Sequence, residues 1–224
     1  MKKDDSFANT EALIADLAKD LAPVRPLARP ALRSAGWLLG AAAYLGVLSA
    51  ALFDPGNAIV AADPRLLLPQ LAAIVTGVLA ATAAFASSVP GYSKRVLLWP
   101  SLAAIVWLGT LIGSPDETPA AALAAQHEWL CVAIIVAGGA PLAAALAIML
   151  RRAAPLTPSV TGAFAALAIG TLANVSACVS LPHSDNTITL VWHGGAIFML
   201  VVAGVLGARF VLARRAAWRT PARP

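Results

Sequence analysis

Charged residues are scarce in this chain. Asp, Glu, Lys and Arg make up 12% of the 224 residues, whereas hydrophobic residues make up 59%. A soluble protein carries about a quarter charged residues. The mean hydropathy is +0.78. Together these values exclude an ordinary soluble globular fold and predict an integral membrane protein.

Catalytic signatures are absent as well. The sequence contains no HExxH, GxSxG or P-loop pattern and no polar segment long enough for a soluble catalytic domain. No Asp or Glu lies deep within a long apolar run, although ion-coupled transporters need ionisable groups at that depth. We therefore expect a protein that is not an enzyme. One function that stays open for such a protein is that of a small membrane transporter or of a scaffold with a structural periplasmic disulfide.

Six apolar runs have about the length that a helix needs to cross a bilayer, roughly 20 residues. They are Ala35–Phe53, Leu66–Ser87, Val96–Ile112, Glu128–Met149, Val160–Val179 and Thr187–Phe210. These runs predict an all-α membrane protein with six transmembrane helices. The predicted domains are a tail at 1–34, a transmembrane domain at 35–210 and a basic tail at 211–224.

The positive charges predict the orientation of these helices. Of the 16 Lys and Arg residues, all but Arg65 lie before the first run, in the second or fourth connection, or at and beyond the end of the last run. Lys and Arg accumulate on the cytoplasmic side of membrane proteins. Both termini are therefore expected in the cytoplasm. The net charge of +5 favours contact with anionic lipid headgroups, and no folded basic domain is present for direct binding of nucleic acid.

Small residues recur along the first run. Gly36, Gly40, Ala43 and Gly46 follow one another at helical spacing. Such stripes allow helices to approach closely in a membrane. We therefore expect this stripe to pack against a neighbouring helix.

The N-terminal tail contains the longest polar stretch, TEALIADLAKDLAPVRPLARP. Its apolar residues Leu13, Ile14, Leu17 and Leu21 fall on one face of a helix. Thr10 is expected to cap this helix, and prolines from Pro23 to Pro30 are expected to end it and to form an extended connector. A helix of two or three turns is marginal in water, so it needs a surface to bind.

The polar side of this helix carries more acids than bases. Glu11, Asp16 and Asp20 accompany a single Lys19. An amphipathic helix that lies on an anionic leaflet is rich in Lys and Arg instead. The sequence therefore favours a partner protein over the membrane surface.

Two cysteines and three histidines are the remaining residues with distinctive chemistry, and the predicted topology places all five at the periplasmic side. Three interpretations of Cys131 and Cys178 stay open: a disulfide or redox pair, a metal site completed by His127 and His183, or small buried residues at helix contacts. Asn174 lies one turn before Cys178, on the same helix face. The third histidine, His193, is expected to be a satisfied interfacial side chain.

Several of these features resemble the NrsF family. They are the tail ALIADLAKDLAPVRPL at 12–27, the turn SVPGYSKRVLLWP at 88–100, and the lone cysteines at the outer ends of the fourth and fifth runs. Members of this family are six-span proteins of the bacterial inner membrane that act as negative regulators of an extracytoplasmic-function sigma factor, sigma-F.

The resemblance implies an anti-sigma factor with a sensory periplasmic side. Cys131 and Cys178 would sense heavy-metal or oxidative stress and cause release of the sigma factor. No constitutive cofactor is implied, and a heavy-metal ion at the periplasmic side is the candidate ligand. Neither the resemblance nor the composition predicts an oligomeric state. The expected sigma-binding residues are Leu13, Ile14, Leu17, Leu21, Pro23 and Val24, with a secondary contact at Pro90, Gly91 and Arg95.

Overall fold

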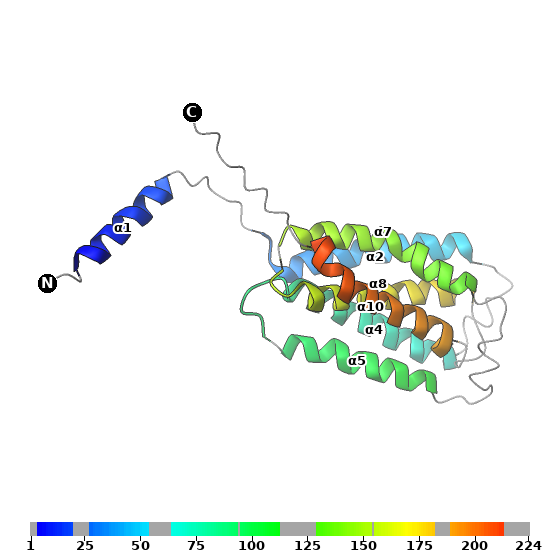
Figure 1. The fold of residues 1–224 in the computed structure, drawn as a ribbon. Coiled ribbons are helices and arrows are strands. Elements are labelled where there is room, and N and C mark those ends of the chain that lie inside the picture. Colours follow the sequence, from blue (N-terminus) through cyan, green and yellow to red (C-terminus); the bar gives the residue numbers. More distant parts are fainter. Residues whose placement is uncertain are drawn as a thin grey trace.

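The computed structural model describes residues 4–19, 27–53, 64–93, 95–112, 129–153, 155–181 and 189–212. These residues form seven α-helices and one π-helix, and no strand occurs among them (Figure 1). The helices are α1 (Asp4–Lys19), α2 (Pro30–Leu52), α4 (Pro64–Ala86), α5 (Arg95–Ile112), α7 (Trp129–Arg151), α8 (Pro158–Ser180), the π-helix η2 (Thr189–Gly194) and α10 (Gly195–Leu212). The all-α prediction is therefore confirmed for the described residues.

Six helical segments of the described chain are long and apolar enough to cross a membrane. They coincide with the six predicted runs, and the sixth is continuous through η2 and α10 over Thr189–Leu212. The chain thus has the architecture of a multi-pass membrane protein. Most predicted ends lie within two residues of the helix ends.

Two predicted boundaries near the N-terminus are wrong. The first span begins at Pro30 rather than Ala35, because proline suits the first turn of a helix, where its missing N–H has no partner to lose. Helix α1 begins at Asp4, so Thr10 lies inside the helix and does not cap it. Pro30 accordingly belongs to α2 and not to the connector before it.

Helix α8 is the centre of the bundle. It packs against α10, α4, α7 and α2, whereas α5 lies at one side against α4 and η2 (Figure 1). Buried polar side chains such as Thr161, Asn174 and Ser180 lie along α8. Because lipid cannot hydrogen-bond to such groups, they belong on a helix that other helices surround.

Glycines allow a very close contact between α8 and α10. A Cβ atom added to Gly204 would lie 2.5 Å from the carbonyl oxygen of Gly162 and 2.8 Å from the Cβ atom of Ala166. The two helices can therefore approach this closely only where neither residue has a side chain.

The predicted stripe in the first span packs differently from our expectation. Cβ atoms added to Gly36, Gly40 or Gly46 would meet no atom within 4 Å. The stripe faces outward, and the opposite face of α2 packs inward through Trp37, Ala41 and Leu45. That prediction was wrong because an apolar helix in lipid can bury either its large or its small residues.

The bundle has two ends with different chemistry. We call them the arginine end, with Arg33 at the start of α2 and Arg151 at the end of α7, and the cysteine end, with Cys131 at the start of α7 and Cys178 at the end of α8. Helix α8 runs from one end to the other. At 23 residues and about 1.5 Å per residue, it is one of the helices long enough to join them.

Candidate functional site

Three side chains meet at the cysteine end of the bundle. Asn174 and Cys178 lie one turn apart on α8, as predicted, and the Cys178 Sγ atom is 3.7 Å from Asn174 Oδ1. The third side chain is His193 of η2, whose Nδ1 atom lies 2.6 Å from Asn174 Oδ1 and 3.5 Å from Cys178 Sγ. We call this group the Cys–His–Asn cluster.

Burial makes the cluster unusual for polar side chains. His193 is 0% exposed and Asn174 is 1% exposed, whereas Cys178 is partly exposed. A buried polar group without a hydrogen bond is costly, so the short contact between His193 and Asn174 stabilises both. Cys178 is therefore the one member of the cluster with an appreciable exposed surface.

The side-chain oxygen of Asn174 determines which atom carries the proton in its hydrogen bond with His193. The Oδ1 atom of Asn174 can only accept a hydrogen bond, so His193 Nδ1–H donates to it at 2.6 Å. The thiol of Cys178 donates toward the same oxygen. Two donors from different helical segments thus converge on one amide oxygen.

A π-helix places His193 in the cluster. The six residues of η2 precede α10 and include His193 as their fifth residue. Single π turns are rare and occur often at functional sites, because the wider turn shifts the residues that follow it. The sequence pattern predicted only a satisfied interfacial histidine, and the π turn that brings it to α8 leaves no periodic signal in an all-apolar run.

Cys131 lies near the same end of the bundle on α7. It is 1% exposed, and Ile135, one turn further along, packs with Ala173 and Ala177 of α8. The start of α7 therefore faces the part of α8 that ends in Cys178.

The predicted histidine ligands are not in the described part of the chain. His127 and His183 fall in 113–128 and 182–188, which lie outside the described residues. Among the residues that are described, no group of three or more His, Cys, Asp or Glu side chains is placed to hold a metal ion. The four-residue metal set therefore stays a prediction.

A second cluster joins four helices at the arginine end. The guanidinium of Arg33 donates a hydrogen bond to the carbonyl oxygen of Met149 on α7 and lies over the ring of Phe85 on α4, 5.1 Å from its centroid. Ser87, at the end of α4, shares a hydrogen bond of 2.8 Å with Thr161 near the start of α8. We call these residues the arginine-end junction.

The predicted secondary contact lies next to this junction. Pro90, Gly91 and Arg95 are exposed, and Gly91 has a φ angle of 79°, a value that favours glycine. The turn is therefore built for a sharp reversal between α4 and α5. Its exposed position fits a contact surface, and its role stays a prediction.

The apolar face of α1 is exposed over its described part. Leu13, Ile14 and Leu17 are 58%, 60% and 64% exposed. Asp16 beside them forms a solvent-exposed ion pair with Lys19 at 3.4 Å. The remaining predicted sigma-binding residues, Leu21, Pro23 and Val24, lie outside the described residues.

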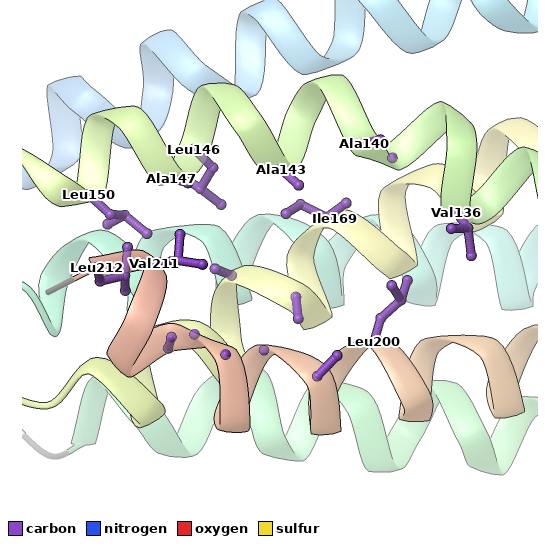
Figure 2. A pocket seen from close by; sticks show the side chains of 18 of the residues that line it. Val136, Ala140, Ala143, Leu146, Ala147, Leu150, Ile169, Leu200, Val211 and Leu212 are labelled. Atoms are coloured by element: carbon purple, nitrogen blue, oxygen red, sulfur yellow. The ribbon is translucent and has the colours of Figure 1, made fainter.

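An apolar groove runs between α7, α8 and α10 (Figure 2). It has a volume of about 360 Å³ and is lined only by Gly, Ala, Val, Leu and Ile, including Leu146, Leu200 and Gly204. Figure 2 shows aliphatic side chains of all three helices around it. This lining offers no group that could bind an ion or activate a substrate.

Comparisons with known proteins bear on this arrangement. A family model described as NrsF, negative regulator of sigma F, matches residues 17–213. Searches of curated proteins and of solved structures gave no significant match. The match includes all six candidate spans, both cysteines and the Cys–His–Asn cluster. The chain therefore belongs to the NrsF family, the negative regulators of sigma F.

Proposed function

We propose that this chain is an anti-sigma factor of the bacterial inner membrane that holds an extracytoplasmic-function sigma factor through its N-terminal segment. Stress at the periplasmic cysteines, from heavy metals or oxidants, would release the sigma factor. Membership of the family implies a sigma factor as the partner. The observation that carries the proposal further is the exposed apolar face of α1.

This face has the features of a helix that binds in a groove of another protein. Leu13, Ile14 and Leu17 are each more than half exposed and form one stripe along α1, the pattern by which amphipathic helices recognise a partner groove. Complete burial of one such side chain contributes roughly 1.5–3 kcal/mol. Burial of all three would therefore favour contact with an apolar groove.

The charges beside the stripe favour a basic partner. Glu11 and Asp16 are exposed on α1, and an acidic edge is repelled by an anionic leaflet. Proteins that bind DNA carry basic surfaces. A sigma factor therefore suits this helix better than the membrane does.

The proposed orientation follows from the positive charges. Lys and Arg residues concentrate at the arginine end of the bundle and in the two tails, which indicates that this end faces the cytoplasm. The cysteine end would then face the periplasm. Residues 1–34 would be available to a cytoplasmic sigma factor.

Helix α8 is the proposed connection between the two sides. It carries Asn174 and Cys178 at one end and Thr161 at the other, and Thr161 is hydrogen-bonded to Ser87 beside the Arg33–Phe85 contact. Arg33 lies in the first turn of α2, the helix that follows the tail. A shift of α8 relative to its neighbours would thus reach the start of α2, as two-state signalling requires.

The transporter alternative has little support from the described bundle. The groove there is lined by aliphatic side chains and glycine. An ion or a polar solute needs polar partners when it leaves water. The groove suits an apolar occupant instead.

A charge placed on the apolar face tests the sigma-binding proposal. The full-length Leu17→Asp variant should fail to co-purify with the extracytoplasmic-function sigma factor of the same organism and should raise transcription of its regulon. Ala15→Asp is the matched control, because Ala15 is exposed on the opposite side of α1. That control should bind the sigma factor as the unmodified chain does. If Leu17→Asp still binds and represses, this face is not the contact.

A further inference from the structure

The separation between Cys178 and His193 equals that of two ligands on one metal ion. Their Sγ and Nδ1 atoms are 3.5 Å apart. A tetrahedral ion with a thiolate at about 2.3 Å and an imidazole nitrogen at about 2.0 Å places these two donors about 3.5 Å from each other. The two side chains could bind such an ion without a change in their spacing.

The donor atoms also select the class of ion. Thiolate sulfur prefers soft and borderline ions, and imidazole suits zinc, copper and related metals. Cys178 is the partly exposed residue of the pair, so we expect an ion to enter from its side of the cluster. His193 is fully buried behind it, where its ring is held in one orientation.

Asn174 competes for the same nitrogen. Its Oδ1 atom lies 2.6 Å from His193 Nδ1, and this hydrogen bond requires a proton on Nδ1. A metal ion needs the lone pair of that nitrogen, so the proton must leave it. An oxygen ligand and a nitrogen ligand of one tetrahedral ion lie about 3.3 Å apart. The contact between Asn174 Oδ1 and His193 Nδ1 is shorter than this separation. Asn174 therefore cannot keep its present position and serve as a third ligand.

We propose that Cys178 and His193 bind one soft or borderline divalent cation through Sγ and Nδ1, and that the ion breaks the hydrogen bond between His193 and Asn174. In this step the Cys178 thiol loses its proton to solvent, and the imidazole proton moves from Nδ1 to Nε2. The sulfur and Nδ1 each donate an electron pair to the ion. One proton is released for each ion bound, and no electron is transferred.

The broken hydrogen bond lies between two helical segments. It joins α8, which carries Asn174, to η2, which leads into α10. An ion that binds only when this bond is open shifts the equilibrium toward a different packing of the two segments. The signalling consequence rests on the proposed anti-sigma function, whereas ion binding itself does not.

Titration of the purified full-length protein with Cd²⁺ tests the inference. Wild-type protein in lipid nanodiscs should develop thiolate-to-cadmium charge-transfer absorption with one ion per chain and should release one proton per ion in weak buffer. Cys178→Ser should abolish the absorption. Cys131→Ser is the control and should bind one ion as the wild type does.

His193→Asn separates metal binding from a structural role. The Asn amide can take the place of Nδ1–H as a donor to Asn174, so the hydrogen bond is kept, but it is a poor ligand for a soft ion. We expect Cd²⁺ affinity to fall at least tenfold while thermal stability stays within a few degrees of wild type. Protection of Cys178 from alkylation by bound Cd²⁺ should be lost in parallel.

Three results would overturn the inference. They are unchanged Cd²⁺ affinity in His193→Asn, loss of the ion in Cys131→Ser, and binding without proton release. Each of these concerns the isolated protein, so it leaves the sigma-binding test of Leu17→Asp unaffected. Conversely, a chain that binds Cd²⁺ as expected but never contacts a sigma factor would refute the proposed function alone.

Discussion

The guanidinium of Arg33 lies over the ring of Phe85, with Cζ 5.1 Å from the ring centroid. The same guanidinium donates to the carbonyl oxygen of Met149, so one side chain joins α2, α4 and α7. Phe85 is fully buried, and the contact therefore lies where the bundle core ends on the arginine end. Beyond it, the chain continues into the N-terminal tail.

Loss of this guanidinium should weaken the bundle. Arg33→Ala removes a cation–π contact and a charged hydrogen bond, and we expect a destabilisation of roughly 1–3 kcal/mol. Arg33→Lys keeps the charge without the planar geometry and should fall in between. Equilibrium unfolding in mixed detergent and SDS micelles measures both. Arg29→Ala is the control, because the Arg29 side chain is exposed and only its backbone carbonyl bonds to α2. An equal loss of stability in Arg29→Ala would show that the contacts of the Arg33 guanidinium are not the cause.

The crossing of α8 and α10 should tolerate no added atoms. In Gly162→Ala and Gly204→Ala, the new methyl group meets the backbone of the opposite helix, which cannot move aside as a flexible side chain could. We expect each variant to lose about 1–3 kcal/mol of stability, the usual cost of overpacking. The same unfolding measurement applies.

Gly207→Ala provides the matched comparison for that crossing. Gly207 also lies on α10, but a Cβ atom there meets nothing within 4 Å. The gain in helix propensity from glycine to alanine is the same at all three positions. Gly207→Ala should therefore be neutral or slightly stabilising, and a loss equal to that of Gly204→Ala would show that the crossing is not the cause.

The architecture could be predicted from the sequence because membrane-spanning helices are set by length and hydropathy. Each run is apolar along its whole circumference, so its ends were found to within a few residues. The same property hides which face packs inward. Gly36 and Gly40 therefore gave a wrong packing prediction, and the close contact of Gly162 with Gly204 was not foreseen.

The candidate site was only half visible in the sequence. Asn174 and Cys178 lie four residues apart, and helical periodicity alone places them on one face. His193 reaches them from another helix through a π turn, and no local pattern reports that kind of approach. The apolar face of α1, proposed to bind the sigma factor, could be predicted because polar residues interrupt its apolar stripe. The start of the helix at Asp4 could not.

Labelling with a membrane-impermeant maleimide should establish the proposed orientation. Two variants are made in a Cys131→Ser, Cys178→Ser background. Ser93→Cys places a single cysteine in the turn before α5, and Phe53→Cys places one at the C-terminal end of α2, on the other side of the bundle. Both positions are exposed. The positive charges indicate that the Ser93 side faces the cytoplasm. Intact cells with permeable outer membranes should label Phe53→Cys alone, and lysed cells should label both. The reverse pattern would place the tail in the periplasm.

Each cysteine should be needed for induction in cells, because the proposed function assigns stress sensing to both. Cys131→Ser and Cys178→Ser should keep basal repression of the sigma regulon, since neither residue belongs to the tail, but should lose most of the response to Cd²⁺. A transcriptional reporter measures both states. Normal induction in both variants would place the sensor elsewhere in the chain.

If Asn174 competes with the ion for His193 as proposed, removal of its amide should make the response to Cd²⁺ more sensitive. In Asn174→Leu, His193 Nδ1 loses its hydrogen-bond acceptor, and the ion-free state loses about 1–1.5 kcal/mol of stabilisation. The ion-bound state has already given up that bond, so its stability changes little. We therefore expect the Cd²⁺ concentration for half-maximal induction to fall about tenfold, since 1.4 kcal/mol corresponds to a factor of ten. Ser176→Ala is the control. Ser176 lies on α8 like Asn174, but its hydroxyl forms a hydrogen bond of 2.8 Å with Ser49 of α2 and not with His193. An unshifted response in Asn174→Leu would show that Asn174 and the ion do not compete for His193.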